Sequence, residues 1–564
     1  MAIGEAHMAA TYNKPGFDIF NHYTYVFCGD GCLQEGVSGE ASSLAGHLGL
    51  GKLIVLYDDN NITIDGPTDL SFTEDVAMRY ESYGWQVITV GEISGEGAVD
   101  ELRAAIAAAQ KETSKPTMIK VRTIIGWGST KADTHSVHGA PLGTEDLAAT
   151  KTKYGLNPGE HFQVGEDVKA VYDARIQENE GIVEDWHALF LKYKEAHPAE
   201  AAELERRFAH KLTDGVLDKL PKFEVGKDKD MATRKFGQAA LNSVAADLPE
   251  LIGGSADLTP SNLTNLNCEG GGDFQKDTPA GRYLRFGVRE HGMAAICNGL
   301  FAYGGLRPFC ATFFNFAGYA LGAIRLSALS KFGVIYIMTH DSIGLGEDGP
   351  THQPVEMCES IRSMPNINLL RPGDCNETSA CYAMALEKHE TPSVICLSRQ
   401  TLPGLVGSCV EKAKKGGYVL SDSNSSKLKL ILVASGSEMG FCVDAAKELN
   451  ASGVATRVVS MPCMDVFLEQ PMEYQKSVFA SGVPCLSVEA SAVHGWHRFS
   501  HGQIGMTRFG ASAPAKDLFK KFGFTTENVV KRGKELIQFY EGSTGGVPDL
   551  MNRPVFDNVV TGGH

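Results

Sequence analysis

The sequence predicts an α/β protein of three consecutive doubly wound domains, each built on a mostly parallel sheet. Its length of 564 residues is enough for about three domains of ordinary size. Short apolar runs that end in glycine and polar residues alternate with helical patterns, and this alternation is typical of parallel sheets. We expect domains over residues 1–210, 231–410 and 411–564, with a linker over 211–230 between the first two.

The first domain opens with a helical pattern and then alternates strands with helices. Residues 1–10 are helix-forming and amphipathic. An apolar strand over 23–28 ends in Gly-Asp-Gly, and a helix is expected over 35–48. The next strand, over 53–57, ends in Asp-Asp-Asn-Asn. Two further strands are expected over 85–90 and 117–122.

Charged helices and two more strand-rich blocks follow. Residues 158–224 are charged and helical and lead into the linker. The third block starts near residue 428 with an apolar strand that runs into a Gly/Ser turn over 435–437. Because the sheets are expected to be parallel, ligands should sit at the carboxyl ends of the strands. In the second block, strands are expected over 251–254, 284–287, 307–311, 334–338 and 393–397.

The charge and cysteine content exclude several classes of partner. The formal net charge is −16, which disfavours nucleic acid and anionic membranes but leaves room for small anions at a local cluster of cations. The 13 cysteines show no repeated short spacing, which favours reduced thiols in a cytosol-like compartment over a disulfide framework. No apolar run is long enough to span a bilayer. We expect a cytoplasmic protein without nucleic-acid or membrane partners.

Two polar segments in the first block predict a divalent-metal and diphosphate site. Asp30 lies in the Gly-Asp-Gly turn between a strand and a helix, where free backbone N–H groups can bind an anion. One helix and one strand separate it from Asn60, so Asn60 should reach the neighbouring strand end. Asp30, the amide oxygen of Asn60 and the backbone carbonyl of Ile62 are hard oxygen ligands suited to Mg²⁺ or Ca²⁺. The alternative is two polar loops without a ligand.

These segments resemble the thiamine diphosphate motif of the transketolase family. The matching stretches are GDGCLQEG at 29–36 and YDDNNITIDG at 57–66. The similarity continues to nearly the end of the chain. Further matching motifs lie at 138–143, 254–262, 285–291, 339–353, 397–400 and 508–512.

The resemblance implies an enzyme that moves a two-carbon ketol unit through a thiamine diphosphate carbanion. The donor would be a ketose phosphate such as xylulose 5-phosphate, and the acceptor an aldose phosphate such as ribose 5-phosphate or erythrose 4-phosphate. This is the reaction of the pentose phosphate pathway and the Calvin cycle. The resemblance also implies bound Mg²⁺, for which Ca²⁺ or Mn²⁺ can substitute, and a homodimer with sites at the subunit interface. The first two domains would bind the diphosphate and the pyrimidine of the cofactor, and the third would be the family's C-terminal domain.

The family motifs assign roles to individual residues. Asp30, Asn60 and Ile62 would hold the metal, and Glu290, His138 and His352 would act in catalysis. The cofactor would contact Gly31, Glu35, Asn60, His138, Asp257, Glu290, Phe313, Phe316 and Tyr319. The substrate would contact His138, Arg234, Ser261, His340, Asp348, His352 and Arg399.

Glu290 is the central catalytic candidate. In the family, the matching carboxyl group hydrogen-bonds N1′ of the aminopyrimidine, and this requires a pKa raised by apolar burial. The apolar residues 293–296 that follow it are consistent with burial. The alternative is a glutamate that opens a helix, stabilised by the helix dipole, with Arg289 as a surface partner.

The other site candidates also have ordinary structural explanations. Phe313, Phe316 and Tyr319 have a spacing that fits one face of a helix, so core packing is the default interpretation. A single arginine or histidine is most often a surface or core residue. Arginine suits phosphate because its planar guanidinium group can donate hydrogen bonds to two phosphate oxygens. Histidine can transfer protons near neutral pH.

One further motif and the start of the chain need interpretation. Residues 344–349 fit the G-x-G-x-x-G pattern that binds dinucleotides. However, this segment contains two acidic residues, and no apolar helical pattern follows it directly, so we do not expect a dinucleotide site.

Transketolases carry a segment upstream of the position that matches Met1. We therefore expect an incomplete first domain with exposed apolar surface, and a plastid location stays open. Alternative functions are a non-catalytic transketolase-like subunit and a relative similar to dihydroxyacetone synthase.

Overall fold

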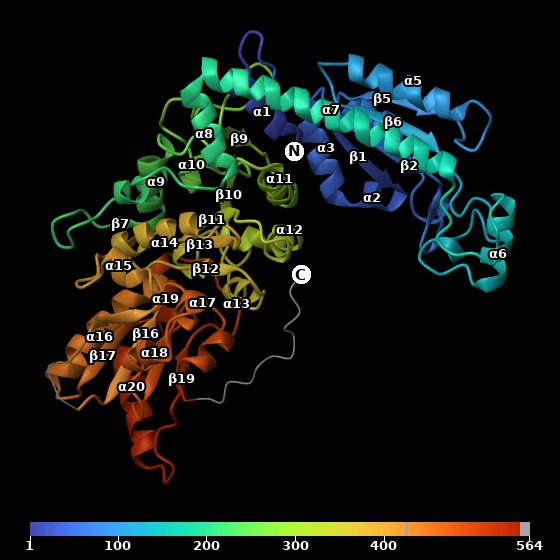
Figure 1. The fold of residues 1–564 in the computed structure, drawn as a ribbon. Helices are drawn as coiled ribbons and strands as arrows, with labels where there is room; N and C mark the ends of the chain where they lie inside the picture. The colour runs from blue at the N-terminus through green and yellow to red at the C-terminus, as the bar shows by residue number, and fades with distance from the viewer. Residues whose placement is uncertain (424–426, 553–564) are drawn as a thin grey trace. The chain divides into compact units, whose positions relative to one another are not determined.

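The computed structural model describes residues 1–423 and 427–552 and divides into two units (Figure 1). The first unit comprises Met1–Ala209 together with Asp273–Gly281. The second comprises His210–Gly272 and Arg282–His564, and it contains both of the larger remaining sheets. The expected α/β architecture with mostly parallel sheets is confirmed.

The first unit is built on a parallel four-stranded sheet in the order β1-β2-β6-β5. Helix α5 packs against β5 and β6, with its small residues Ala105 and Ala109 buried (Figure 1). The strands are β1 (Thr24–Gly29), β2 (Leu53–Asp59), β5 (Gln86–Val90) and β6 (Thr117–Arg122). The main helices are α1 (Ala2–Tyr12), α2 (Asp30–Gln34), α3 (Gly36–His47), α4 (Val76–Ser82), α5 (Ala98–Lys111), α6 (Thr144–Lys153), α7 (Glu166–Ala196) and α8 (Pro198–Phe208).

The structure refines two helical predictions in the first unit. The expected amphipathic helix at the start forms as α1, but it is buried around most of its surface, including Glu5 and His7, because the rest of the unit encloses it. The helix expected over 35–48 forms as α3, but a short helix that was not expected, α2, precedes it and ends at Gln34. Glu35 has an extended backbone and serves as the N-cap position of α3.

The second sheet has six parallel strands in the order β12-β13-β11-β10-β8-β9. Helices α9 and α14 pack together beside β13, while α11 pairs with α12 and covers β10 (Figure 1). The strands are β8 (Leu251–Ser255), β9 (Tyr283–Arg285), β10 (Arg307–Phe313), β11 (Ile335–Thr339), β12 (Asn368–Leu370) and β13 (Ser393–Leu397). The helices are α9 (Thr233–Ala245), α10 (Thr259–Asn262), α11 (Glu290–Tyr303), α12 (Ala317–Leu329), α13 (Met357–Arg362) and α14 (Cys375–Glu387).

Sequence patterns located five of these strands and missed β12. Strand β12 has only three residues, which gives a weak strand pattern, although β9 is equally short and was located. Residues 211–230, the expected linker, include the 3₁₀ turn η3 (Val216–Lys219), whose Val216 packs in the core of the second sheet.

The third sheet has the order β15-β17-β16-β18-β19, with only β15 antiparallel to its neighbour. Every residue of β16 is buried, as expected of a central parallel strand covered on both faces. Helices α16 and α20 pack on each other and on β16 (Figure 1). The strands are β15 (Tyr418–Ser421), β16 (Leu430–Ala434), β17 (Thr456–Ser460), β18 (Cys485–Val488) and β19 (Gly502–Ile504). The helices are α15 (Val410–Ala413), α16 (Met439–Ala451), α17 (Met464–Leu468), α18 (Met472–Val478), α19 (Ala515–Lys521) and α20 (Thr526–Glu541).

Across residues 1–423 and 427–552, no helix combines the length and apolar composition that crossing a membrane requires.

Candidate functional site

In the first unit, the two predicted polar segments meet at one edge of the sheet. Strands β1 and β2 are parallel neighbours, with Gly29 opposite Asp58. Asp30 follows β1 directly, and its carboxylate accepts hydrogen bonds from the Tyr57 hydroxyl at 2.5 Å and from the Asn61 backbone N–H at 3.0 Å. The expectation that the Asn60 segment reaches the strand end beside Asp30 is therefore confirmed.

Three predicted metal ligands offer hard oxygen atoms at this edge. Asp30, Asn60 and Ile62 are all buried. The side-chain oxygen of Asn60 accepts a hydrogen bond from the Ile62 N–H at 2.9 Å, which fixes the turn between them. Among the described residues, no group of three or more His, Cys, Asp or Glu side chains could hold a metal ion. The candidate set has a single carboxylate, so it needs further oxygen atoms from its ligand.

The charge around Asp30 fits a bound cation. Burial raises the pKa of Asp30, and Asp59 and Asp58 raise it further, against the lowering effect of the Tyr57 and Asn61 hydrogen bonds. Lys120 pairs with Asp59 at 3.3 Å, whereas the hydrogen bonds to Asp30 come from neutral donors. A divalent cation would relieve the repulsion among these carboxylates, and oxygen ligands of this kind suit Mg²⁺.

The remaining candidates of the first unit are exposed. Gly31 lies in the first turn of α2, and Glu35 lies between α2 and α3. His138 follows the 3₁₀ turn η2 (His135–Val137), on the segment between β6 and α6. This segment leaves the same edge of the sheet as the metal candidates, since the Thr123 N–H donates to the Asp59 carbonyl at 3.2 Å.

In the second unit, the candidates follow the carboxyl ends of five parallel strands. Because these strands run parallel in one sheet, their carboxyl ends share one edge. Asp257 and Ser261 follow β8, Glu290 follows β9, Phe313 and Phe316 lie at the end of β10, His340, Asp348 and His352 follow β11, and Arg399 follows β13.

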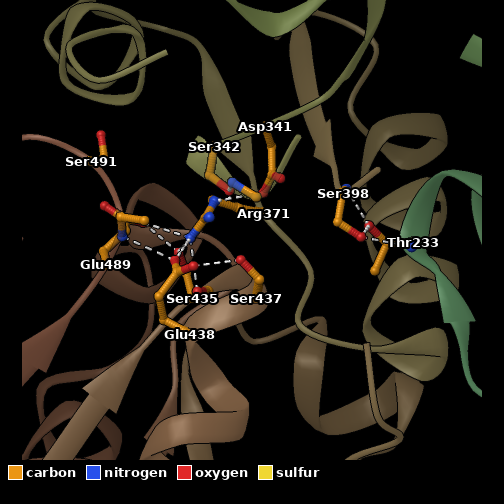
Figure 2. A network of polar contacts seen from close by, with 12 residues as sticks. Thr233, Asp341, Ser342, Arg371, Ser398, Ser435, Ser437, Glu438, Glu489 and Ser491 are labelled. Atoms are coloured by element: carbon orange, nitrogen blue, oxygen red, sulfur yellow. Dashed lines mark hydrogen bonds and ion pairs between the residues drawn. The ribbon is translucent and has the colours of Figure 1, made fainter. Parts of the chain in front are cut away.

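Two arginines form the cationic part of this edge. Arg234 at the start of α9 and Arg399 after β13 are held by their neighbours, because Thr233 and Ser398 exchange hydrogen bonds (Figure 2). The Arg234 guanidinium also donates to the Ser261 carbonyl at 2.5 Å. Burial lowers the pKa of Arg234, and the charge of Arg399 lowers it further. Two adjacent arginines that repel each other create a site that an anionic ligand would stabilise.

His340 lies beside this cationic pair and is buried. Its backbone is left-handed, with φ of 61°, and its Nδ1 atom is 2.9 Å from the Thr339 hydroxyl, which also donates to Asn262 at 2.7 Å. Burial, Arg234, Arg399 and His352 together lower the pKa of His340 to about 3. The imidazole is therefore neutral near pH 7 and can exchange hydrogen bonds without adding charge.

The aromatic candidates surround the histidines, but not as one face of a helix. Phe313 ends β10, Phe316 lies in the 3₁₀ turn η4 (Phe314–Phe316) and Tyr319 lies in α12, so the helical-face interpretation is wrong. The strand ends between the first two residues, which changes the backbone direction. The Phe313 ring stacks on His340 with centroids 3.8 Å apart, and Phe316 lies 5.0 Å from His352. Tyr319 is 69% exposed and lies 6.0 Å from Phe316.

Glu290 is the first residue of α11 and is only 9% exposed. The following turn buries Gly292, Met293 and Ala294, so the expected apolar burial is confirmed. The residue also opens its helix, so burial and a helix-dipole contribution are both present. Arg289 donates a hydrogen bond to the Phe286 carbonyl at 2.9 Å.

The loop that carries Asp348 and His352 is not a dinucleotide fingerprint. After Gly349 the chain continues through turns, and the next α-helix, α13, begins only at Met357. Asp348 is exposed on this loop, and the His352 N–H donates to the Gly349 carbonyl at 3.0 Å. This agrees with the sequence prediction.

Sequence reasoning missed several residues that support the candidates. Tyr57, Thr233, Ser398 and Asn262 each bond a candidate residue or its immediate neighbour. Each lies within a motif discussed above or next to a candidate residue, but each has a short polar or phenolic side chain that carries no distinctive pattern. Only their contacts in the fold identify them.

Comparison with known protein families gives three matches in chain order. Residues 1–213 match the transketolase thiamine diphosphate-binding domain. Residues 229–404 match the transketolase pyrimidine-binding domain, and residues 416–525 match the transketolase-like C-terminal domain.

Individual relatives agree over almost the whole chain. Transketolase of Scheffersomyces stipitis is 49% identical over 548 residues, which cover 96% of this chain and 80% of the relative. Transketolase 1 of Saccharomyces cerevisiae is 51% identical over 550 residues, with the same two coverages of 96% and 80%. The crystal structure of Pichia stipitis transketolase with sedoheptulose-7-phosphate superposes with a TM-score of 0.94 at 48% identity, covering 98% of this chain and 82% of that one.

Proposed function

The chain belongs to the transketolase family, and from that premise we propose that its two clusters of candidate residues are the halves of a thiamine diphosphate-dependent ketol-transfer site. The reaction moves a two-carbon ketol unit from a ketose phosphate such as xylulose 5-phosphate to an aldose phosphate. The observation that carries the proposal is the placement of a buried glutamate, stacked aromatics and paired arginines along one edge of a parallel sheet.

The first unit supplies the metal and diphosphate half. Asp30, Asn60 and Ile62 would hold Mg²⁺ through their oxygen atoms, and the buried, crowded carboxylate of Asp30 supports this. Gly31 and Glu35 would contact the diphosphate, and His138 lies on the segment that leaves the same sheet edge. Ca²⁺ or Mn²⁺ can take the place of Mg²⁺, because both also accept oxygen ligands.

The second unit supplies the pyrimidine and substrate half. When bound, thiamine diphosphate supplies an acidic carbon that can carry the two-carbon unit. Glu290 would hold or release a proton at the pyrimidine, from its buried position at the start of α11. Asp257, Phe313, Phe316 and Tyr319 would contact the pyrimidine ring.

The substrate contacts follow from the charge of the same sheet edge. Arg234 and Arg399 bind the phosphate group, while Ser261 and Asp348 hydrogen-bond the sugar. His340 is neutral and binds hydroxyl groups, and His138 and His352 move protons as carbon–carbon bonds break and form.

The assembly and domain limits extend the proposal. By resemblance, the chain forms a homodimer in which each site combines the first unit of one subunit with the second unit of the other. The proposed domains are residues 1–210, 231–410 and 411–564, with the segment 211–230 between the first two. Sedimentation velocity with and without thiamine diphosphate and Mg²⁺ would measure the assembly state.

The test is ketol transfer by the purified chain. The assay combines thiamine diphosphate, Mg²⁺, xylulose 5-phosphate and ribose 5-phosphate, and follows the glyceraldehyde 3-phosphate released. Glu290→Gln should lower kcat by about 10²–10⁴-fold while cofactor binding persists, because the amide keeps the shape but cannot take up a proton. Retained turnover in this variant would remove Glu290 from its assigned role.

The same assay separates the alternative functions. A wild-type chain that binds cofactor or assembles, but transfers no ketol unit, would be a non-catalytic subunit. Turnover that requires formaldehyde as the acceptor would indicate a relative of dihydroxyacetone synthase.

A further inference from the structure

A buried ion-pair network joins the second and third sheets beside the proposed substrate site. Its centre is Arg371, which follows β12 and is fully buried. The Arg371 Nε atom donates to the Asp341 carboxylate at 2.9 Å, and Nη1 donates to the Glu438 carboxylate at 2.6 Å and the Ser435 carbonyl at 2.9 Å (Figure 2). One guanidinium therefore bonds groups from both sheets.

The third-sheet partners lie where an α/β sheet would ordinarily bind a ligand. Ser435 and Glu438 follow the carboxyl end of β16, and Glu489 follows the carboxyl end of β18, its parallel neighbour. Ligands of open α/β sheets bind at this edge. Here the guanidinium of Arg371 occupies it, so the third sheet binds a side chain of the second block.

The backbone of the third block approaches Arg371 closely. Gly436 has φ of +60°, and a Cβ atom at this position would lie 2.5 Å from the Arg371 guanidinium carbon. The Gly436 N–H donates to the Arg371 carbonyl at 3.1 Å, and the Arg371 N–H donates to the Pro462 carbonyl at 2.8 Å. Both the side chain and the backbone of Arg371 are thus fixed by the third block.

A second arginine completes the network from the same side. Arg362 forms a two-pronged ion pair with Glu489, at 2.7 and 2.8 Å, and Trp496 donates its indole N–H to the same carboxylate at 2.7 Å. Burial works to lower the pKa of Arg371, but Glu438, Asp341 and Glu489 outweigh it and hold the pKa well above the ordinary value. The guanidinium is therefore a permanent charge.

Asp341 connects this network to the site. It directly follows His340, whose φ of 61° lies in the left-handed region that non-glycine residues adopt uncommonly. On the other side, the Ser342 hydroxyl accepts the Gly344 N–H at 3.2 Å and starts the loop toward His352. Only one oxygen of the buried Asp341 carboxylate has a hydrogen-bond partner among the described residues, and that partner is Arg371.

We propose that Asp341 and Arg371 are positioning residues of the substrate site. They hold His340 in the position from which it binds the substrate. The third domain takes part in substrate binding by supplying Glu438 and Glu489, which hold Arg371. This inference rests on the proposed function, because it assigns His340 to the substrate.

The test is a double-mutant cycle read through KM and binding. Asp341→Asn keeps the shape but weakens the bond to Arg371, and His340→Asn removes the imidazole while tolerating a left-handed backbone. We expect Asp341→Asn to raise the KM for xylulose 5-phosphate about tenfold and to change kcat less than about threefold. In the His340→Asn background, the same substitution should leave KM within about twofold, because it acts through the missing imidazole.

Arg371→Lys serves as a second variant, because it keeps the positive charge but loses the planar guanidinium group and its several N–H donors. It should reproduce the KM increase of Asp341→Asn. The matched control is Glu377→Gln: Glu377 is also fully buried and joins the same two sheets through Gly373, Tyr418 and Ser460. The control should lower the melting temperature without moving KM.

Calorimetric binding of ribose 5-phosphate gives a readout that needs no turnover. If the wild type binds the sugar phosphate but turns nothing over, the proposed function fails. In that case, a Kd for ribose 5-phosphate that is tenfold weaker in Asp341→Asn than in the wild type still supports the positioning role. Three outcomes would overturn the inference. The first is that the two substitutions multiply their effects on KM in the double variant, and the second is that KM and Kd are unchanged in Asp341→Asn. The third is that the wild type binds no sugar phosphate.

Discussion

At the scale of single residues, Asp30 shows how a candidate ligand depends on its supports. The Tyr57 hydroxyl donates to the Asp30 carboxylate at 2.5 Å and lies 3.3 Å from Asp59. Tyr57 is itself buried and comes from the neighbouring strand. Partners of this kind orient metal ligands and are typically worth 10–100-fold in metal affinity.

Substitutions at these two residues should affect the cofactor in graded steps. Asp30→Ala should weaken Mg²⁺-dependent binding of thiamine diphosphate by at least about 100-fold, and Tyr57→Phe by about tenfold. Titration of intrinsic fluorescence with cofactor at fixed Mg²⁺ measures both. Tyr25→Phe on the adjacent strand is the control, since its hydroxyl bonds Gln110 outside the site. Equal affinity for Asp30→Ala and the wild type would place the metal elsewhere.

At the scale of elements, β1 is an edge strand with exposed apolar side chains on both faces of the sheet. Within the described residues it pairs only with β2, and Tyr25, Val26 and Phe27 are exposed, Phe27 by 80%. This agrees with the expectation of exposed apolar surface in the first block. Exposed apolar side chains on an unpaired strand edge favour association with another chain.

Replacing Phe27 should therefore change association more than folding. Phe27→Ser should leave the free energy of unfolding within about 0.5 kcal/mol of the wild type, because little surface is buried there. Self-association measured by light scattering over a concentration series should fall. Phe539→Ser, which removes a 69%-exposed phenylalanine from α20, should leave self-association unchanged. A large loss of stability in Phe27→Ser would show that the ring is packed.

At the scale of the whole molecule, a pair of histidines links stability to pH. The rings of His210 and His389 lie 3.8 Å apart, and both pack against Phe301. Burial, followed by the repulsion of His210 and Arg307, lowers the pKa of His389 from 6.5 to about 4. The unfolded chain therefore binds a proton at a higher pH than the folded chain does.

Stability should fall as the pH is lowered through this window. Between about pH 6.5 and 4 the unfolded state holds the extra proton, so the free energy of unfolding decreases with acidification. Urea denaturation at pH 7.0, 6.0 and 5.0 measures the slope, which should be smaller in His389→Asn. His187→Asn on the exposed surface of α7 is the control for loss of one histidine. An unchanged slope in His389→Asn would remove the pair from this role.

Much of the site could be predicted because its residues follow strand ends. A strand pattern and the polar residues just after it are local, so Asp30 and Asn60 could be placed on one edge before any contact was known. The same argument placed the candidates after β8, β10, β11 and β13. The helical face proposed for Phe313, Phe316 and Tyr319 failed because spacing alone does not show where a strand ends.

The sequence by itself determined the α/β class, the order of the blocks, the polar strand ends and the resemblance to transketolases, since each is written in adjacent residues. Only the tertiary structure decided which distant side chains meet. Arg371 and Glu438 are 67 positions apart, and nothing in the spacing relates them. Their contact depends on how the second and third blocks pack against each other, and the buried charges are stable there only because they are paired. The role of the third block could therefore be inferred only from the fold.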